Sequence, residues 1–150
     1  MRFGTCTSST ITPETTSAGG RRCFAVALPA DGRVTADLRR AVREHARRWG
    51  VPDCADAVLV ASELFANAVL HGTPAVGTSV RVEVAHLGEC IRIAVTDGCR
   101  DRVPVRRDVS ETAESGRGLR LLDDLTRDWD TTVAEDGKTV WAEVPIHPAT

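Results

Sequence analysis

Apolar and polar positions change period several times along the chain, and each pattern predicts an element. Residues 22–29 form an apolar run that ends at a proline, which predicts a strand. Over residues 34–49 the apolar side chains recur at helical spacing and charged side chains occupy the opposite side, which predicts an amphipathic helix. Asp53 is the expected N-cap of a second, mostly apolar helix that continues to about His71.

The second half of the chain predicts strands with one intervening helix. Residues 78–87 and 90–97 both alternate between apolar and polar and are joined by Gly-Glu, which predicts a hairpin. A polar, arginine-rich stretch over 98–115 predicts a long loop, and residues 116–129 return to helical spacing. Residues 129–145 have the pattern of two strands joined by an Asp-Gly turn.

The order of these elements predicts one domain. We expect residues 1–20, which are rich in Ser, Thr and Gly, to form a flexible tail. Residues 21–150 are expected to form a single globular unit, because 150 residues with 42% hydrophobic content bury one sizeable core. Strands joined by short turns pair antiparallel. The expected fold is an α/β two-layer sandwich, in which about three helices cover one face of a mostly antiparallel, mixed β-sheet.

Charge and cysteine content narrow the classes of partner. The formal net charge is -2, and the arginines of the first helix alternate with acidic residues, so we expect no nucleic-acid partner. No apolar run is long enough to span a bilayer and the N-terminus lacks the apolar segment of a signal peptide, so we expect a cytoplasmic protein with no membrane partner. The five cysteines are widely spaced with no C-x-x-C pair, which predicts reduced thiols.

Polar residues interrupt the apolar stretch "ASELFANAVLHG" (residues 61–72) at the end of the second predicted helix. Glu63, Asn67 and His71 follow each other at four-residue spacing and share one helix face. That face is either the solvent side of an ordinary amphipathic helix or a polar stripe in a partly buried cleft, where each group needs a partner such as a ligand. An Asn oxygen suits Mg²⁺ and a Glu carboxylate suits proton transfer, a combination that fits phosphoryl transfer.

Two further candidate sites lie later in the sequence. Asp97 ends an apolar strand before Gly98, and is either an ordinary strand-to-turn residue or a carboxylate that accepts a hydrogen bond from a ligand amino group. Gly116 and Gly118 begin the third helix, where they either close a flexible loop or expose backbone N–H groups to an anion. The chain has no G-x-x-x-x-G-K-[ST], which excludes a P-loop, and no G-x-G-x-x-G after a strand, which argues against a dinucleotide fold.

In their order along the chain, "ELFANAVLHG", "VTDG", a polar lid and "GRGL" resemble the N, G1 and G2 boxes of the Bergerat fold. Gyrase, Hsp90, histidine kinases and MutL share this ATP-binding fold. The E-x-x-x-N-A-x-x-H-G form and the short length resemble the anti-sigma factor serine/threonine kinases. The resemblance covers roughly residues 22 to 145, and it implies ATP and Mg²⁺ as cofactors.

The resemblance also implies a role for each matching residue. Asn67 would ligate Mg²⁺, and Glu63 would be the catalytic base. Asp97, followed by Gly98, would receive the adenine amino group, and Thr139 matches a threonine that the family often places beside that aspartate. The phosphate end of the site would be lined by Gly116, Arg117, Gly118 and Leu119.

One motif departs from the family pattern. The G1 box is commonly D-x-G-x-G, whereas residues 97–101 read "DGCRD" and lack both later glycines, which would stiffen the start of the lid. The lid arginines would either contact phosphate oxygens or form a solvated basic loop. His71 fits the box, but as the last residue before Gly72 it would cap the helix or pack against the lid rather than contact ATP.

These features predict an ATP-dependent serine/threonine protein kinase of the anti-sigma type, which phosphorylates a serine on a small antagonist protein. The resemblance implies a sigma factor, the antagonist or both as partners, and a homodimer. The alternative is a non-catalytic, nucleotide-sensing regulator that binds a sigma factor or another protein. Glu63 argues against that alternative, and the altered G1 box argues for it. A third possibility is a sandwich that no longer binds nucleotide.

Overall fold

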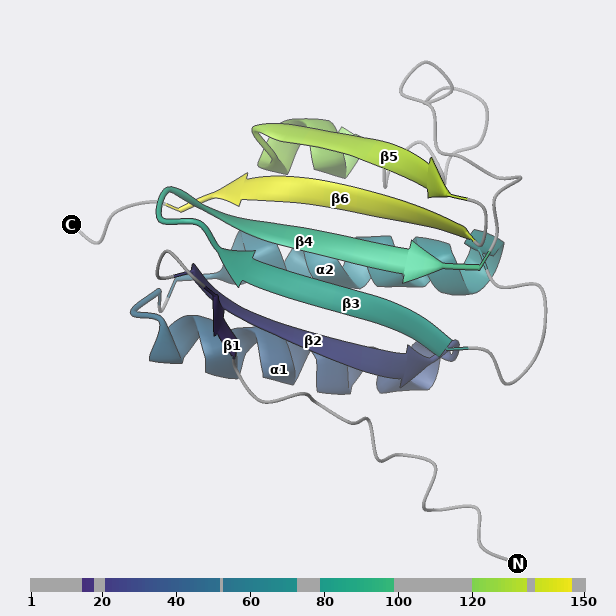
Figure 1. The fold of residues 1–150 in the computed structure, drawn as a ribbon, viewed down its shortest axis with the longest axis horizontal. Helices are drawn as coiled ribbons and strands as arrows, with labels where there is room; N and C mark the ends of the chain where they lie inside the picture. The colour runs from purple at the N-terminus through teal and green to yellow at the C-terminus, as the bar shows by residue number, and fades with distance from the viewer. Residues whose placement is uncertain are drawn as a thin grey trace, which may run out of the picture.

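A six-stranded antiparallel sheet forms one layer of the protein, and helices cover one of its faces (Figure 1). The computed structural model describes residues 15–17, 21–51, 53–72, 79–98, 120–134 and 137–146. The strand order is β1-β2-β3-β4-β6-β5, and every pairing between these strands is antiparallel. The predicted two-layer α/β sandwich is therefore confirmed.

The strands and helices follow the predicted order. The strands are β1 (Thr15–Ser17), β2 (Arg21–Pro29), β3 (Ser79–His86), β4 (Cys90–Asp97), β5 (Asp128–Ala134) and β6 (Gly137–Pro145). The helical elements are η2 (Gly32–Val34), α1 (Thr35–Arg48), α2 (Ala55–Asn67) and η3 (Ala68–Gly72), with a further helical stretch over residues 120–125. Residues 99–115 of the predicted loop and the beginning of the third predicted helix, residues 116–119, lie outside the described residues.

Alternation along the central strands places the core on the helical side of the sheet. In β3 the valines at 80, 82 and 84 are each 0% exposed, while the residues between them face away from the core. β4 repeats the pattern with Ile91, Ile93 and Val95, as its sequence predicts. Gly88 turns the chain between these two strands with φ +91°, a conformation that favours glycine.

The start of each long helix differs by one residue from the prediction. Asp31 is the N-cap of η2, and its side chain accepts a hydrogen bond from the backbone N–H of Arg33. The helix α1 then begins at Thr35. The N-cap of α2 is Cys54 rather than Asp53, and it makes no side-chain capping bond. The Cys54 carbonyl accepts the first helical hydrogen bond, from Val58 N–H at 2.9 Å, so the helical backbone begins after Asp53.

Part of the predicted tail forms a strand instead. Residues 15–17 make β1, which pairs antiparallel with β2 in the register Thr15↔Cys23. Two β-branched threonines favour an extended backbone, and the edge of β2 offers free backbone donors and acceptors. The rest of the predicted tail, residues 1–14 and 18–20, lies outside the described part of the chain.

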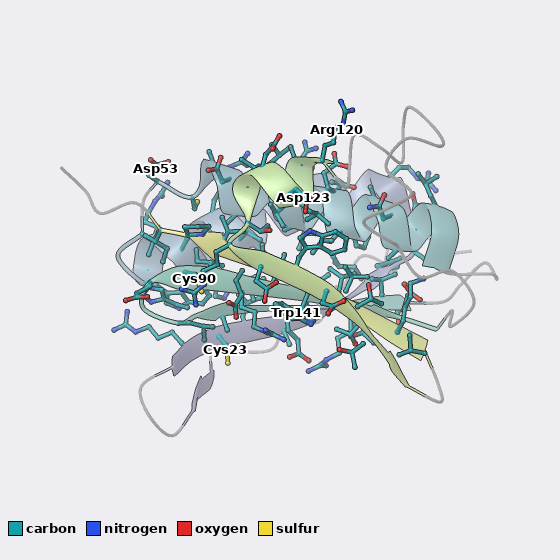
Figure 2. The ribbon with its side chains drawn as sticks, turned by 90° about the horizontal axis from the view of Figure 1, so that it is seen from above. Cys23, Asp53, Cys90, Arg120, Asp123 and Trp141 are labelled. Atoms are coloured by element: carbon teal, nitrogen blue, oxygen red, sulfur yellow. The ribbon has the colours of Figure 1, made fainter. Side chains whose placement is uncertain are left out.

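A side-chain hydrogen bond connects the helix at 120–125 to β5, the next element in the sequence. Leu122 is 1% exposed, and the indole Nε1 of Trp129 donates to Oδ1 of Asp123 at 2.8 Å. Figure 2 shows Asp123 in this helix, on the same side of the sheet as the other helices. The described helices include none that is long and apolar enough to cross a membrane.

Candidate nucleotide site

Glu63 and Asn67 lie one turn apart near the C-terminal end of α2. Both are in the α-helical part, so their four-residue spacing puts them on one face, as predicted. The helix then changes to the π-form η3 at Ala68, and His71 falls within it. A π-turn uses more residues than an α-turn, so the predicted stripe keeps its register for Glu63 and Asn67 but not for His71.

The side chains of Glu63 and Asn67 are available to a ligand. Both residues are half-buried. Among the residues that the structure describes, none forms a hydrogen bond or an ion pair with either side chain. The described residues therefore leave this face of α2 open to solvent or to a ligand, the two interpretations that the sequence offers.

A polar contact that the sequence does not reveal holds this part of α2 against α1. Ser62, which is 4% exposed, donates from Oγ to the carbonyl of Val58 at 2.8 Å. Arg39 of α1 donates from Nε to the same Oγ at 3.0 Å. Ser62 immediately precedes Glu63, so this bond between helices restrains the backbone that carries the carboxylate. The only signal in the sequence is a serine within an apolar helical run.

Asp97 occupies the last position of β4 and faces the helical layer. It is 4% exposed and continues the inward-facing positions of Ile93 and Val95. Across the β4–β6 register its partner is Lys138, whose Nζ lies 3.6 Å from Oδ2 of Asp97. The Lys138 side chain is 5% exposed, so an ammonium and a carboxylate meet inside the protein. Gly98 follows and is exposed.

Thr139 does not lie beside Asp97, contrary to the expectation from the resemblance. It is paired in register with Thr96, and the two hydroxyl oxygens are 2.8 Å apart. Successive side chains of a strand point to opposite faces, so Thr96 and Thr139 lie on the face away from the helices. The β6 residue that faces Asp97 is Lys138.

Gly137 lets the start of β6 approach the end of β4. A Cβ atom built on Gly137 would lie 2.0 Å from the backbone carbonyl oxygen of Asp97 and 3.2 Å from the Cα of Gly98. No side chain fits in that space. The sequence predicts an Asp-Gly turn at this glycine but does not reveal its close contact with Asp97.

The ends of α2 and β4 are brought to one side of the molecule. η3, which continues directly from Asn67, contacts β4. Figure 1 shows the end of α2 and η3, the end of β4 and the start of β6 together at one side of the sandwich. The structure thus gathers Glu63 and Asn67 with the Asp97–Lys138 pair at the same end.

Among the described residues, Asn67 is the one whose chemistry suits Mg²⁺ bound with ATP. Mg²⁺ keeps several waters and takes few protein ligands, which suits a single amide oxygen from Asn67. The described residues contain no group of three or more His, Cys, Asp or Glu side chains that could hold a metal alone. The predicted phosphate-end residues Gly116, Arg117, Gly118 and Leu119 lie outside the described residues.

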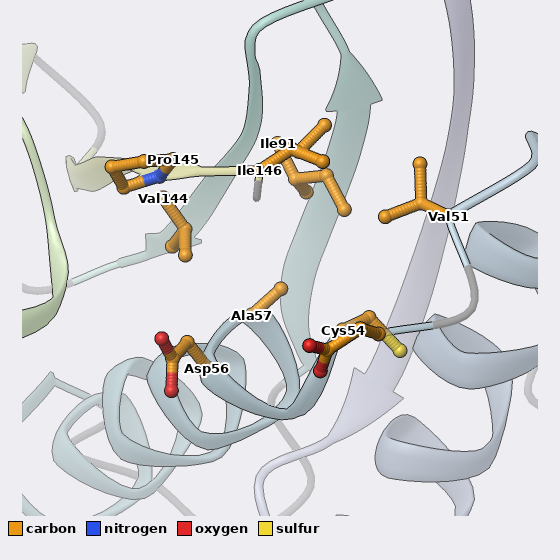
Figure 3. A pocket seen from close by; sticks show the side chains of 9 residues that line it. Val51, Cys54, Asp56, Ala57, Ile91, Val144, Pro145 and Ile146 are labelled. Carbon is orange, nitrogen blue, oxygen red and sulfur yellow. The ribbon is translucent and has the colours of Figure 1, made fainter. Parts of the chain in front are cut away.

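A cavity of about 140 Å³ lies at the other end of the sandwich (Figure 3). It is lined by residues at the start of α2, including Cys54 and Asp56, and by Ile91 and Val144, which pair at the beginning of β4. The Asp97↔Lys138 pair lies at the opposite end of the same two strands. This cavity is therefore separate from the site around Asp97.

A match to a protein-family model shows the family of this chain. Residues 28–144 match the model of the histidine kinase-like ATPase domain. The chain belongs to the histidine kinase-like ATPase domain family. Membership is consistent with the antiparallel sheet, with the position of Asp97 at a strand end and with Asn67 at the end of α2, and it places the chain among ATP-using domains.

One solved structure similar to this histidine kinase-like ATPase domain is the histidine kinase domain from Erythrobacter litoralis EL346 blue-light activated histidine kinase. The two chains are 17% identical with a TM-score of 0.48, and the match covers 79% of this chain. It covers 61% of that chain, so this protein corresponds to about three fifths of its length. No curated protein matches the sequence.

Proposed function

We propose that this ATPase-family domain is a serine/threonine protein kinase of the anti-sigma factor type. The observation that carries the proposal is the pair Glu63 and Asn67, two half-buried polar side chains on one face of α2 with no partner among the described residues. A domain that only senses nucleotide has no need of a carboxylate one turn from its magnesium ligand.

In this proposal the residues of α2 divide the work of phosphoryl transfer. Asn67 offers its side-chain oxygen to Mg²⁺, which when bound neutralises charge on the phosphate oxygens. Glu63 accepts the proton of the substrate serine as its hydroxyl oxygen bonds to the γ-phosphorus. The bond between that phosphorus and the bridging oxygen breaks, and ADP leaves with the electron pair. The products are phosphoserine, ADP and a protonated Glu63.

Asp97 serves the other end of the nucleotide in this proposal. Its carboxylate accepts a hydrogen bond from the adenine amino group, at the position where β4 ends. Gly137 brings the β6 backbone against the Asp97 carbonyl and so fixes the orientation of that strand end. A rigid base site limits the positions that the triphosphate can adopt, and restricted position is much of what a kinase contributes to the rate.

The proposed protein partners are a small antagonist protein that carries the target serine and a sigma factor. Support for both comes from the E-x-x-x-N-A-x-x-H-G form of residues 63–72. A cytoplasmic location and a homodimer belong to the same proposal. We expect size-exclusion chromatography with light scattering to report a dimer. A monomer at all concentrations would contradict the proposed homodimer.

Phosphate transfer tests the chemistry. The full chain would be incubated with γ-labelled ATP, Mg²⁺ and a pool of candidate antagonist proteins, as wild type, Glu63→Gln and Glu44→Gln. Glu44 is an exposed residue of α1, so its variant controls for loss of one negative charge. We expect wild type and Glu44→Gln to label one antagonist and Glu63→Gln to lose about 100-fold or more, the typical effect of removing a general base. Equal labelling by all three would show that Glu63 is not the base.

Calorimetric titration tests the binding site separately. We expect the wild type to bind Mg-ATP and Asn67→Ala to bind it at least tenfold more weakly, because the metal loses its protein ligand. Chelation of Mg²⁺ should weaken binding to the wild type and leave Asn67→Ala nearly unchanged. Identical heats for the two proteins would mean that Asn67 does not hold the metal.

A binding-only regulator is the second proposal, and the stretch after Asp97 favours it. Residues 97–101 lack the later glycines of the usual G1 box, and residues other than glycine have fewer backbone conformations open to them. Such a protein would bind Mg-ATP and a sigma factor but label no antagonist. Full binding of ATP by both wild type and Glu63→Gln, with no transfer by either, would support this second function over the first.

A further inference from the structure

The cavity at the start of α2 is large enough for a small organic molecule. Its volume is about 140 Å³. An engineered apolar cavity of about 150 Å³ holds benzene, so this space accommodates an apolar group of about six carbon atoms. Apolar residues line a large part of it: Val51, Ala57, Ile91, Val144, Pro145 and Ile146.

Two carboxylates at the same cavity have no cation paired with them. Asp53 is exposed and Asp56 is half-buried, and both line the cavity. Neither side chain forms a hydrogen bond or an ion pair with another described residue. The N–H groups at the helix N-terminus favour carboxylates here but leave their negative charge in place. Because no described residue that lines the cavity is basic, the lining itself supplies no cation.

Two arginines of α1 influence this region without lining the cavity. Burial raises the pKa of the Cys54 thiol, whereas the charges of Arg43 and Arg47 act in the opposite direction, so both guanidinium groups lie within electrostatic range of the thiol. Neither arginine forms an ion pair with Asp53 or Asp56. These arginines weaken the negative potential, so the attraction of the carboxylates for a cation is modest and sensitive to salt.

The apolar and acidic groups lie on opposite sides of the space. Figure 3 shows Ile91, Val144 and Pro145 on the strand side, across from the start of α2 with Asp56. Apolar walls hold the body of a ligand, and a few polar groups fix its orientation. A molecule with an apolar body and one cationic end therefore matches this cavity better than a neutral or anionic molecule of the same shape.

We propose that this cavity is a binding site for a small organic cation, an ammonium group on an apolar body of about four to seven carbon atoms. Asp53 and Asp56 attract the ammonium, and Ile91 and Val144 contact the apolar body. The ammonium belongs either to a free amine or to a lysine side chain of another protein. The inference goes beyond the proposed kinase function and does not rest on it.

Matched ligands test the site in the full chain. Benzylamine has both the charge and the ring, benzyl alcohol has the same shape without the charge, and methylamine has the charge without the ring. In ¹H–¹⁵N correlation spectra, we expect benzylamine to shift the amide signals of Cys54, Ala57 and Ile91, and methylamine to leave them unchanged. Benzylamine should bind about threefold or more tightly than benzyl alcohol at low salt. The difference should shrink in about 1 M salt.

Three results of these titrations would overturn the proposal. Equal affinities for benzylamine and benzyl alcohol at low salt would show that the carboxylates do not select a cation. Shifts confined to residues outside the cavity would show that benzylamine binds elsewhere. Absence of binding by both molecules would show that the cavity is not a ligand site.

Variants separate the roles of charge and space. The double variant Asp53→Asn, Asp56→Asn should bind benzylamine no more tightly than benzyl alcohol, with the affinity for benzyl alcohol unchanged. Asp37→Asn is the control and should keep the wild-type preference, because its exposed carboxylate lies on α1, 3.9 Å from Arg40. A double variant that also keeps the preference would overturn the role of the two carboxylates.

Ala57→Leu tests the space itself. The larger side chain occupies the cavity that Ala57 lines, so this variant should bind neither benzylamine nor benzyl alcohol. Unchanged binding of both would contradict a site in this cavity. Circular dichroism reports whether the variant is folded, and if it is not, the ligand series and the carboxylate variants decide.

Two further ligands identify the source of the ammonium. Butylamine and Nα-acetyl-lysine methylamide carry the same butylammonium chain, and the second places it in a peptide context. Tighter binding of butylamine would support a free amine as the ligand. Equal or tighter binding of the blocked lysine would support a lysine side chain of another protein.

Discussion

Nζ of Lys138 lies 3.6 Å from Oδ2 of Asp97, directly across the β4–β6 register, with the two side chains 5% and 1% exposed. The inward positions that precede Asp97 on β4 and follow Lys138 on β6 are apolar, so this ion pair lies at the end of an apolar row on each strand. A buried ion pair of this kind adds little to the free energy of unfolding, but removal of one member alone destabilises the protein strongly.

The first prediction concerns that dependence. Lys138→Met should lower the free energy of unfolding by about 3 to 5 kcal/mol, because it removes the ion-pair partner of a buried carboxylate. The double variant Asp97→Asn, Lys138→Met should recover most of the loss. Arg81→Met breaks an exposed ion pair of 2.7 Å with Glu83 and should cost less than about 1 kcal/mol. Urea denaturation measures all three, and equal losses in the single and double variants would contradict the prediction.

The second prediction concerns Gly137. Gly137→Ala should destabilise the protein by about 1 to 3 kcal/mol or more, because the new methyl group would lie 2.0 Å from the Asp97 carbonyl oxygen and must push β6 away from β4. Gly32→Ala is the matched control, since a Cβ there has no atom within 4 Å. Thermal unfolding should show a lower midpoint for the first variant only. An unchanged midpoint for Gly137→Ala would mean that the strand ends are not in close contact.

The third prediction concerns the bond between α1 and α2. A double-mutant cycle with Arg39→Met and Ser62→Ala should give a coupling of about 0.5 to 1.5 kcal/mol, the usual size for a partly buried hydrogen bond. Arg40→Met with Ser62→Ala is the control cycle, because Arg40 instead lies 3.9 Å from the exposed Asp37. We expect no coupling there. A coupling near zero in both cycles would remove Arg39 as a support for this part of α2.

The fourth prediction concerns thiol reactivity. Cys90 is fully buried, and burial raises the pKa of its thiol and that of Cys54. Iodoacetamide at neutral pH should therefore modify the half-buried Cys23 before the buried Cys90, as read by mass spectrometry of the separate peptides. Equal rates at Cys23 and Cys90 would contradict the burial of Cys90.

The raised pKa of Cys90 also sets the sign of a pH effect on stability. Folding favours the neutral thiol, so its contribution is complete below the unfolded pKa, roughly 8.5, and is lost as the pH rises through the higher folded pKa. Cys90→Ala should remove that part of the alkaline loss in a pH series of urea denaturations. A variant with the same alkaline slope as wild type would show that Cys90 does not contribute to it.

Much of the fold follows from local pattern. Alternation at period two predicts that Val80, Val82 and Val84 face the core, and the helical spacing of Glu63 and Asn67 predicts that they share a face of α2. These relationships depend only on the geometry of one strand or one helix. The same local reasoning gave the wrong N-cap for α2, because side-chain type at Asp53 does not decide which carbonyl accepts the first helical bond.

The sequence alone therefore determined the class of fold, the order of its elements and the two polar side chains of α2 that carry the proposed chemistry. Only the tertiary structure decided what stands beside Asp97. A strand's neighbouring residues face opposite sides, so a shift of one residue in the β4–β6 register exchanges Lys138 for Thr139 at that position. The register is set by contacts between segments far apart in the chain, and no local pattern specifies it.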